Sequence, residues 1–131
     1  MAAIRFHPFV GVGLGRFKPS LYAPPDAPPA VLEHQGKAHN QFVSLAAEVG
    51  VPAALALIAF LLSLAVKAWR ARPSGVALLG VLTVFVLLCL LHDPLFHAES
   101  SLAFMLALGA GLGLIERRQA EASSTAAARS S

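Results

Sequence analysis

The sequence predicts an all-α integral membrane protein, with about three transmembrane helices preceded by a loop rich in glycine and proline. Two observations carry this prediction. First, 56% of the 131 residues are hydrophobic and only 13% are charged, with a mean hydropathy of +0.68. That balance is unlike a disordered chain or an ordinary soluble domain. Second, the apolar residues are concentrated in three runs without any charge, at 51–66, 75–91 and 102–115.

These three runs are long enough to cross a bilayer once their flanks contribute. Each holds about 14 to 17 residues and covers ~21 to 25 Å as helix, slightly short of the ~30 Å hydrocarbon core. Apolar residues within 40–49 extend the first run, and Pro94–Phe96 extends the third. We therefore predict membrane helices at roughly 51–67, 75–91 and 94–115. A buried helical core in a soluble protein is the alternative, disfavoured because so short a chain has too few polar faces to wrap three apolar helices.

The distribution of basic residues predicts the orientation in the membrane. One cluster fills the turn between the first two helices and another follows the third, so both lie on one side and mark it as cytoplasmic. The segment 1–49 and the loop 92–99 then face outward. The two clusters consist of Lys67, Arg70, Arg72, Arg117 and Arg118.

The predicted chain has three parts. Residues 1–49 form the outward loop and a surface helix, residues 50–118 form the three-helix transmembrane segment, and residues 119–131 form a disordered cytoplasmic tail rich in Ala and Ser. Prolines between positions 18 and 36 favour an extended, partner-facing loop. The chain enters its glycine string without any preceding element, which favours the C-terminal fragment of a longer protein.

Composition also excludes several classes of function. Cys89 is the single cysteine and lies in an apolar run, so no disulfide framework is expected. The net charge of +3 does not indicate a nucleic-acid partner, because the basic residues are divided between two faces of a membrane without a continuous stripe. No HExxH motif or His/Cys ligand spacing is present, so we expect neither a metal nor another cofactor.

Local signals fix several helix ends. Asn40 is placed to cap the helix that follows it, and Pro52 predicts a bend between that surface helix and the first membrane helix. Asp93 followed by Pro94 predicts the start of the third helix. Within that helix, the small residues of 109–113 form a face of the GxxxG kind that lets another helix approach closely.

Candidate phosphate-binding residues lie near the start of the outward loop. Gly11, Gly13 and Gly15 form a Gly-x-Gly-x-Gly string, but the preceding strand and the Gly-Lys-Ser/Thr of nucleotide-binding motifs are missing. The string is either a flexible entry to the loop or a cradle for a phosphate through backbone N–H groups. Arg16 either contacts a phosphate bidentately or anchors the loop at lipid headgroups.

A second group of candidates lies at the end of the outward loop. His39 and Asn40 place an imidazole and an amide where they could contact a pyrophosphate or a sugar hydroxyl; the alternative is a surface histidine at a helix end. Lys37 adds a cation, and the helix N-terminus capped by Asn40 adds partial positive charge. Three further polar residues are expected at the same face, as interfacial rather than catalytic groups: His92, His97 and Glu99.

Taken together, these motifs resemble the O-antigen ligase and O-antigen polymerase (Wzy C-terminal type) family of integral-membrane glycosyltransferases. In that family a Gly-x-Gly-x-Gly string opens a large periplasmic loop. It is followed by a His-Asn/Ser/Gln pair, nine residues and a glycine. His39, Asn40 and Gly50 have that spacing in this chain.

The resemblance covers roughly residues 4–115 and includes positions around the motif. Phe42 and Glu48 are similar to the family's usual apolar and acidic positions. The chain departs from the pattern three residues after the motif glycine, where the family has Gly, Thr or Tyr and this chain has Ala53.

The resemblance implies a function and a location. A polysaccharide would be transferred, without a metal, from undecaprenyl pyrophosphate to an acceptor hydroxyl on a glycan or on lipid A-core. The reaction would take place on the periplasmic face of the bacterial inner membrane. His39 would act at the acceptor hydroxyl or at the donor pyrophosphate, and Arg16 and Lys37 would offset the charge of the leaving group. Family members also need arginines from upstream segments.

Other functions stay open at this point. An O-antigen polymerase or a protein O-oligosaccharyltransferase would use the same donor with a different acceptor. A non-catalytic membrane module or transporter fragment is the competing class. A transporter is expected to place ionisable residues within its membrane spans. None lies within the three charge-free runs, which favours the enzyme.

Overall fold

The computed structural model describes residues 2–29 and 38–130, and within these ranges it contains helices and no strand. The all-α prediction is therefore confirmed. The elements, in chain order, are α1 (Ala2–Phe6), η1 (Pro19–Tyr22), α3 (Gln41–Glu48), α4 (Val51–Arg70), α5 (Val76–Leu91), η2 (Pro94–Phe96) and α6 (Ala98–Ser130).

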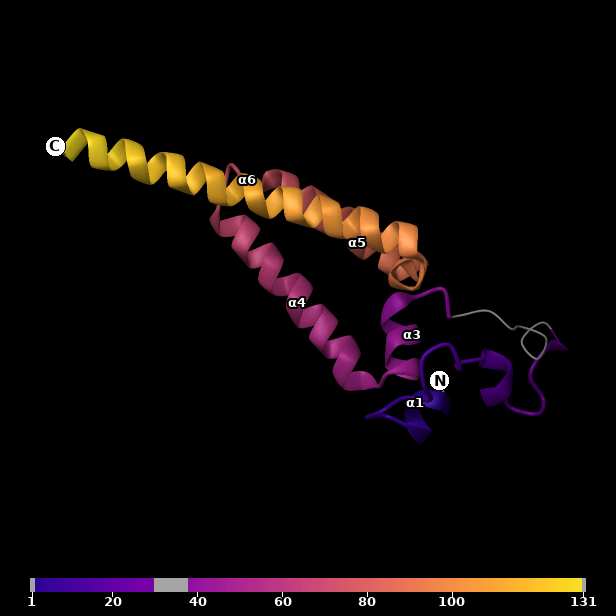
Figure 1. Cartoon of the computed structure of the whole chain (residues 1–131). Coiled ribbons are helices and arrows are strands. Elements are labelled where there is room, and N and C mark those ends of the chain that lie inside the picture. Colours follow the sequence, from indigo (N-terminus) through magenta and orange to yellow (C-terminus); the bar gives the residue numbers. More distant parts are fainter. Residues whose placement is uncertain (1, 30–37, 131) are drawn as a thin grey trace.

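The three long helices form a V with α3 at its open end. Figure 1 shows α5 lying along α6, while α4 leaves the α4–α5 turn at an angle and diverges from both. The short helix α3 contacts the start of α4 and also contacts α5. Beyond α3 lie α1 and the glycine string, so the N-terminal segment is carried at the open end of the V.

The core lies where α5 packs between α4 and α6. The buried residues of α5 recur at intervals of three and four positions, which places them on one helix face. The rings of Phe85 and Phe104 stack across α5 and α6 with their centroids 3.6 Å apart. The buried core consists of Leu61, Leu64 and Ala68 of α4, Leu78, Leu82, Phe85 and Cys89 of α5, and Phe104, Leu108 and Ile115 of α6.

Large apolar side chains also cover the outside of the bundle. Leu91 is 72% exposed, Leu106 is 66% exposed and Leu62 is 61% exposed. Helices α4 and α6 are both long and apolar enough to cross a membrane, and little of either apolar stretch is buried inside the protein. Such exposed apolar surface is uncommon on soluble proteins and supports association with a membrane. Helix α5 has 16 residues and is shorter than these two.

The third long helix begins later and ends later than the sequence predicted. Pro94–Phe96 forms a separate 3-10 turn, and Asp93 makes no side-chain cap there, so α6 begins at Ala98 rather than at 94. The helix then continues to Ser130, through the tail that we expected to be disordered. Residues 116–130 contain neither Gly nor Pro and are rich in Ala, which favours helix. With 33 residues, α6 extends to about 50 Å and projects past the α4–α5 turn (Figure 1).

The predicted signals around α3 are confirmed. The Asn40 side-chain oxygen accepts hydrogen bonds from the N–H groups of Phe42 and Val43, both at 3.1 Å. The chain turns between α3 and α4 at Gly50, whose φ of 108° is a conformation that favours glycine. Pro52 lies in the first turn of α4, where its missing N–H disrupts no helix bond.

The two ends of the bundle have different polar character, as the orientation model requires. Lys67 Nζ lies 3.5 Å from Glu116 Oε1, so the basic clusters after α4 and in α6 share one end. At the other end, the rings of His39 and His92 lie 5.7 Å apart. Which end faces the cytoplasm stays a prediction.

Candidate functional site

The glycine string is docked against the C-terminal end of α3. The N–H of Val12 donates to the carbonyl of Ala47 at 2.9 Å, and the N–H of Gly13 donates to the carbonyl of Glu48 at 2.9 Å. The last carbonyls of a helix have no partner within the helix itself. A segment more than thirty positions earlier in the chain therefore supplies partners for the end of α3.

Two glycines make this close approach possible. A side chain at Gly11 would overlap the backbone carbonyl of Glu48, and Gly11 has a φ of +62°. A side chain at Gly50 would overlap the carbonyl of Phe9. Because both obstacles are backbone atoms, neither can move aside without displacing the chain. The N-terminal segment and the α3–α4 corner can therefore pack this closely only because both positions are glycine.

Glu48 joins the two pieces with its side chain as well. It is only 1% exposed, and its Oε2 accepts a hydrogen bond from the N–H of Gly15 at 2.8 Å. Its Oε1 is buried, and within the described ranges it has no hydrogen-bond partner. A buried carboxylate is favourable only when it is well bonded. Glu48 therefore links the string to α3 through Oε2 alone, and the burial of Oε1 opposes the stabilisation that this bond provides.

A polar stripe runs along the buried side of α3. Gln41, Ser44 and Glu48 are all buried, and their spacing of three and four residues puts them on one helix face. At the start of the helix, Gln41 Oε1 accepts a hydrogen bond from the N–H of Leu95 at 2.8 Å. The stripe therefore connects η2 at one end of α3 with the glycine string at the other.

Three histidines gather at the N-terminal end of α3. His39 and His92 approach edge-on at 5.7 Å, and His92 and His97 lie 6.4 Å apart. The side-chain amide of Asn40 donates to the carbonyl of Leu90 at 3.3 Å, which ties the start of α3 to the end of α5. His92 and His97 were expected only at the same face; the structure places His92 beside His39, and His97 beside His92. Among the described residues, no group of three or more potential ligands could hold a metal ion.

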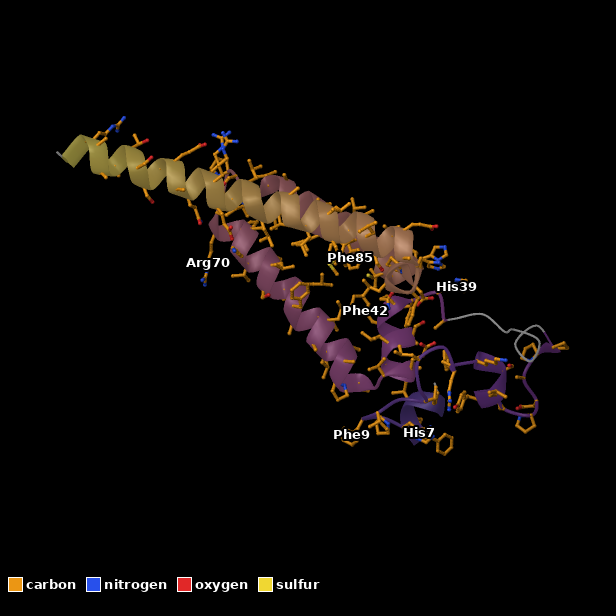
Figure 2. The ribbon with its side chains drawn as sticks, viewed as in Figure 1. His7, Phe9, His39, Phe42, Arg70 and Phe85 are labelled. Carbon is orange, nitrogen blue, oxygen red and sulfur yellow. The ribbon has the colours of Figure 1, made fainter. Side chains whose placement is uncertain are left out.

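The backbone at His39 is in a left-handed conformation. Its φ is 51°, which an L-residue other than glycine adopts rarely, and His is among the residues enriched there. The strain is of the order of 1–2 kcal/mol. Figure 2 shows His39 outside the α3 ribbon, at the polar end of the bundle.

Arg16 lies just beyond the docked string. Its side chain folds back toward Gly13, where an added Cβ would be 3.2 Å from Arg16 Cδ. Its N–H donates to the carbonyl of Gly13 at 3.1 Å. The guanidinium is exposed and forms no ion pair with the part of the chain that the structure describes. Lys37, the other predicted cation, lies outside the described residues.

The three glycine N–H groups are used within the chain. Gly11 donates to the carbonyl of His7 at 3.0 Å, Gly13 to the backbone of Glu48, and Gly15 to its carboxylate. A phosphate cradled by these groups would have to displace all three bonds. In this conformation the string instead fixes the position from which Arg16 projects.

The predicted residues form two groups rather than one pocket. His39 and Asn40 lie at the start of α3, while the glycine string and Arg16 lie at its end. The eight residues of α3 separate the two groups by about 12 Å. Both groups are at the open end of the V, one at each end of one short helix, and Figure 2 labels His39 of the first group.

Sequence reasoning missed the structural role of Glu48 and of Gln41. The signal was present, because Gln41, Ser44 and Glu48 recur at helical spacing within a mostly apolar stretch. A polar stripe at that spacing is usually interpreted as a solvated face. Here it is the buried face, because the glycine string and η2 cover its two ends.

Comparisons of the chain with protein-family models, with curated proteins and with solved structures find no match. Function must therefore be argued from the motif and from the geometry around α3.

The docking of the string can be tested by comparing two alanine substitutions. Gly11→Ala adds a backbone overlap to left-handed strain, together about 2 kcal/mol or more. Gly15→Ala adds strain of about 1 kcal/mol alone, since no atom lies within 4 Å of its added Cβ. The measurement is the rate of tryptic cleavage after Arg16 under native conditions, which reports local opening.

We expect cleavage to accelerate by about thirtyfold or more in Gly11→Ala and by no more than about tenfold in Gly15→Ala, at about 1.4 kcal/mol per tenfold. Equal rates in the two variants would show that the string is not held by its contact with α3.

Proposed function

We propose that this chain forms part of a membrane glycosyltransferase of the O-antigen ligase type, which transfers a polysaccharide from undecaprenyl pyrophosphate to an acceptor hydroxyl. One observation carries the proposal. The interval between Asn40 and Gly50 corresponds to one structural unit, from the cap of α3 to the corner that follows it. The spacing of the motif is therefore the length of a helix that separates two groups of polar residues.

The membrane arrangement that supports this function has three spans. Helices α4 and α6 have the length, and α5, at about 24 Å, completes a third crossing together with the turns at its ends. We place the basic end of the bundle in the cytoplasm and the end with the three histidines in the periplasm of a bacterial inner membrane.

The reaction requires a proton acceptor and compensation for the leaving group. The acceptor hydroxyl oxygen forms a bond to the anomeric carbon, the bond from that carbon to the pyrophosphate oxygen breaks, and the hydroxyl proton must be removed. An imidazole is suited to this role near neutral pH. His39 either takes this proton or, when charged, holds a phosphate. The additional negative charge that develops on the pyrophosphate as it leaves is offset by Arg16 and by the predicted cation Lys37.

The two groups of residues then have separate roles along one extended substrate. Arg16 is held by the string at the C-terminal end of α3, and His39 is held at the other end by the cap of Asn40. A lipid-linked glycan has its pyrophosphate next to the first sugar, so a substrate lying along α3 would meet a cation first and an imidazole next. Glu48 positions the string and is not assigned contact with substrate.

The proposed topology is tested with two cysteines on one helix. Ser100→Cys and Ser124→Cys lie near opposite ends of α6 and are each made in a Cys89→Ser background. Because α6 is proposed to span the bilayer, a maleimide that cannot cross the inner membrane should label Ser100→Cys in intact spheroplasts. Ser124→Cys should react only after lysis. Labelling of both before lysis would show that α6 does not cross, and the opposite pattern would invert the orientation.

The role of His39 is tested with substitutions that separate the imidazole from the backbone strain. His39→Asn and His39→Gly tolerate the left-handed conformation, whereas His39→Ala does not. If the imidazole acts in proton transfer or phosphate binding, all three should lower the rate of glycan attachment by about 10²-fold or more. Only His39→Ala should also lose stability, by about 1 kcal/mol.

These variants are made in the native gene, and attachment of labelled glycan to acceptor is measured in membranes at matched protein levels. Parental transfer by His39→Asn would remove His39 from the site. Loss of transfer in His39→Ala alone would assign the effect to the backbone.

The role of Arg16 is tested with a substitution that keeps the positive charge and changes the geometry of the charged group. If its planar guanidinium binds a donor phosphate, Arg16→Lys should restore only part of the activity lost in Arg16→Ala, because an ammonium group has no bidentate fit. Transfer rate is measured against donor concentration. A Lys variant that is fully active would make Arg16 an anchor at the headgroups, and parental rates in both variants would exclude it from the site.

A further inference from the structure

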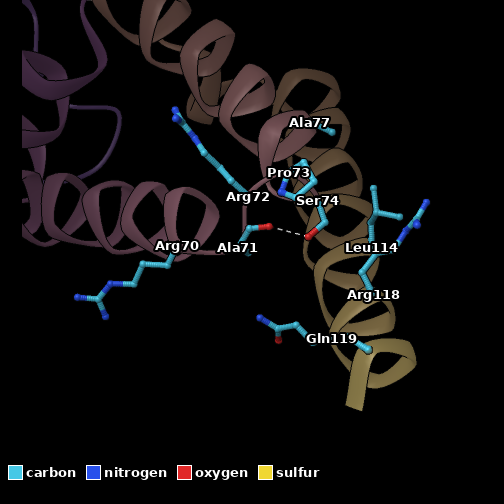
Figure 3. Close-up of a pocket in the computed structure, with 10 residues that line it drawn as sticks. Arg70, Ala71, Arg72, Pro73, Ser74, Ala77, Leu114, Arg118 and Gln119 are labelled. Atoms are coloured by element: carbon cyan, nitrogen blue, oxygen red, sulfur yellow. Dashed lines mark hydrogen bonds between the residues drawn. The ribbon is translucent and has the colours of Figure 1, made fainter. Parts of the chain in front are cut away.

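A second polar site lies at the opposite end of the bundle from the histidines. A pocket of about 690 Å³ opens between the α4–α5 turn and α6. Three of its lining residues are arginines, Arg70 from the end of α4, Arg72 from the turn and Arg118 from α6 (Figure 3). No carboxylate lines this pocket among the described residues. Its lining is therefore strongly positive.

Neighbouring charges outside the pocket are already paired. Lys67 lies 3.5 Å from Glu116, and Arg117 lies 2.9 Å from Glu121 on the same helix. Both acidic residues that come closest to this end of the bundle are thus engaged with basic residues that do not line the pocket. The charge of the pocket is not neutralised by these pairs.

The pocket arginines have different surroundings. The guanidinium carbon of Arg72 lies 3.1 Å above the centre of the Trp69 ring, a cation–π contact. Arg70 and Arg118 form no ion pair with any described residue. Figure 3 shows the three guanidinium groups directed away from one another, as like charges are, at the ends of long stems that border the pocket.

The pocket also has an apolar side. Leu114 and Ala77 line it together with the arginines. Trp69 is 59% exposed beside it, and exposed tryptophans of membrane proteins are concentrated at the headgroup level. A ligand that fits this setting carries a phosphate at one end and apolar chains at the other, which a free phosphate ion does not.

We propose that this pocket binds the headgroup of an anionic phospholipid, with the side chains of Arg70 and Arg118 rotating from the directions seen in Figure 3 to meet its phosphate and its acyl chains lying along Leu114. Guanidinium groups bind phosphate oxygens bidentately, and basic pockets between membrane helices on the cytoplasmic side suit anionic headgroups. The bound lipid would bridge the α4–α5 turn and α6 at the point of the V. The proposal requires the helices to be in a membrane and does not depend on glycan transfer.

Trp69 provides a local reporter, because it is the single tryptophan of the chain. The full chain is reconstituted in phosphatidylcholine bilayers, and its fluorescence is measured while brominated phosphatidylglycerol or brominated phosphatidylcholine is added. Bromine on an acyl chain quenches a nearby indole. We expect phosphatidylglycerol to quench at about fivefold lower concentration or better, as one basic residue at an anionic surface contributes ~1 kcal/mol.

The variants separate a built site from general attraction. Arg70→Gln/Arg118→Gln should abolish the preference. The control pair is Arg118→Gln and Arg129→Gln, which make the same charge change on the same helix inside and outside the pocket. Arg118→Gln should weaken the preference and Arg129→Gln should leave it intact. Arg70→Lys/Arg118→Lys keeps the charge and should retain part of the preference for phosphatidylglycerol. Its circular dichroism serves as a check on folding.

Three outcomes would overturn the proposal. Equal quenching by the two lipids in the parent protein would show no anionic preference. An equal loss in Arg118→Gln and Arg129→Gln would show attraction by net charge alone. Complete displacement of phosphatidylglycerol by inorganic phosphate would show an ion site without a lipid requirement. Inactivity in glycan transfer would leave these measurements unchanged, so failure of the two proposals is distinguishable.

Discussion

The arrangement of this protein depends on the close approach of two backbones at the C-terminal end of α3. Gly11 and Gly50 let the N-terminal segment and the α3–α4 corner come into direct contact, and the N–H groups of the string then supply partners for carbonyls that α3 leaves unpaired. Such groups are expensive to bury without partners. The contact therefore holds α3 at the mouth of the V, and both groups of candidate residues take their positions from it.

The sequence predicted those structural features well that depend only on interactions between neighbouring residues. Asn40 as a cap, Pro52 at a bend and the charge-free runs each depend on a few neighbouring residues, and the structure contains all of these features. The predicted end of the third helix was wrong. The Ala- and Ser-rich composition of residues 119–131 was interpreted as a disordered tail, although a run of helix formers that continues a long helix needs no new nucleation. The 3-10 turn after Asp93 was not predicted, because its geometry is set by the contact between Leu95 and α3.

The sequence predicted which residues are candidates for the site, but not how those residues are arranged in space. The motif identified His39, Asn40 and the glycine string, but it gave no sign that His39 and Arg16 lie at opposite ends of a helix. Long-range contacts decide this, since Gly15 and Glu48 are far apart in the chain and meet only in the fold. The positive φ of His39 was also hidden, because strain at one residue is a property of the structure around it.

The buried polar stripe of α3 gives the two groups a physical connection. Gln41 bonds to η2 and Glu48 bonds to the string, so the short helix is held at both ends through side chains of one face. Because the string bonds to one end of α3 and η2 bonds to the other, the helix sets the distance between Arg16 and His39. In the proposed function, α3 is therefore the element that spaces the cation from the imidazole along one substrate.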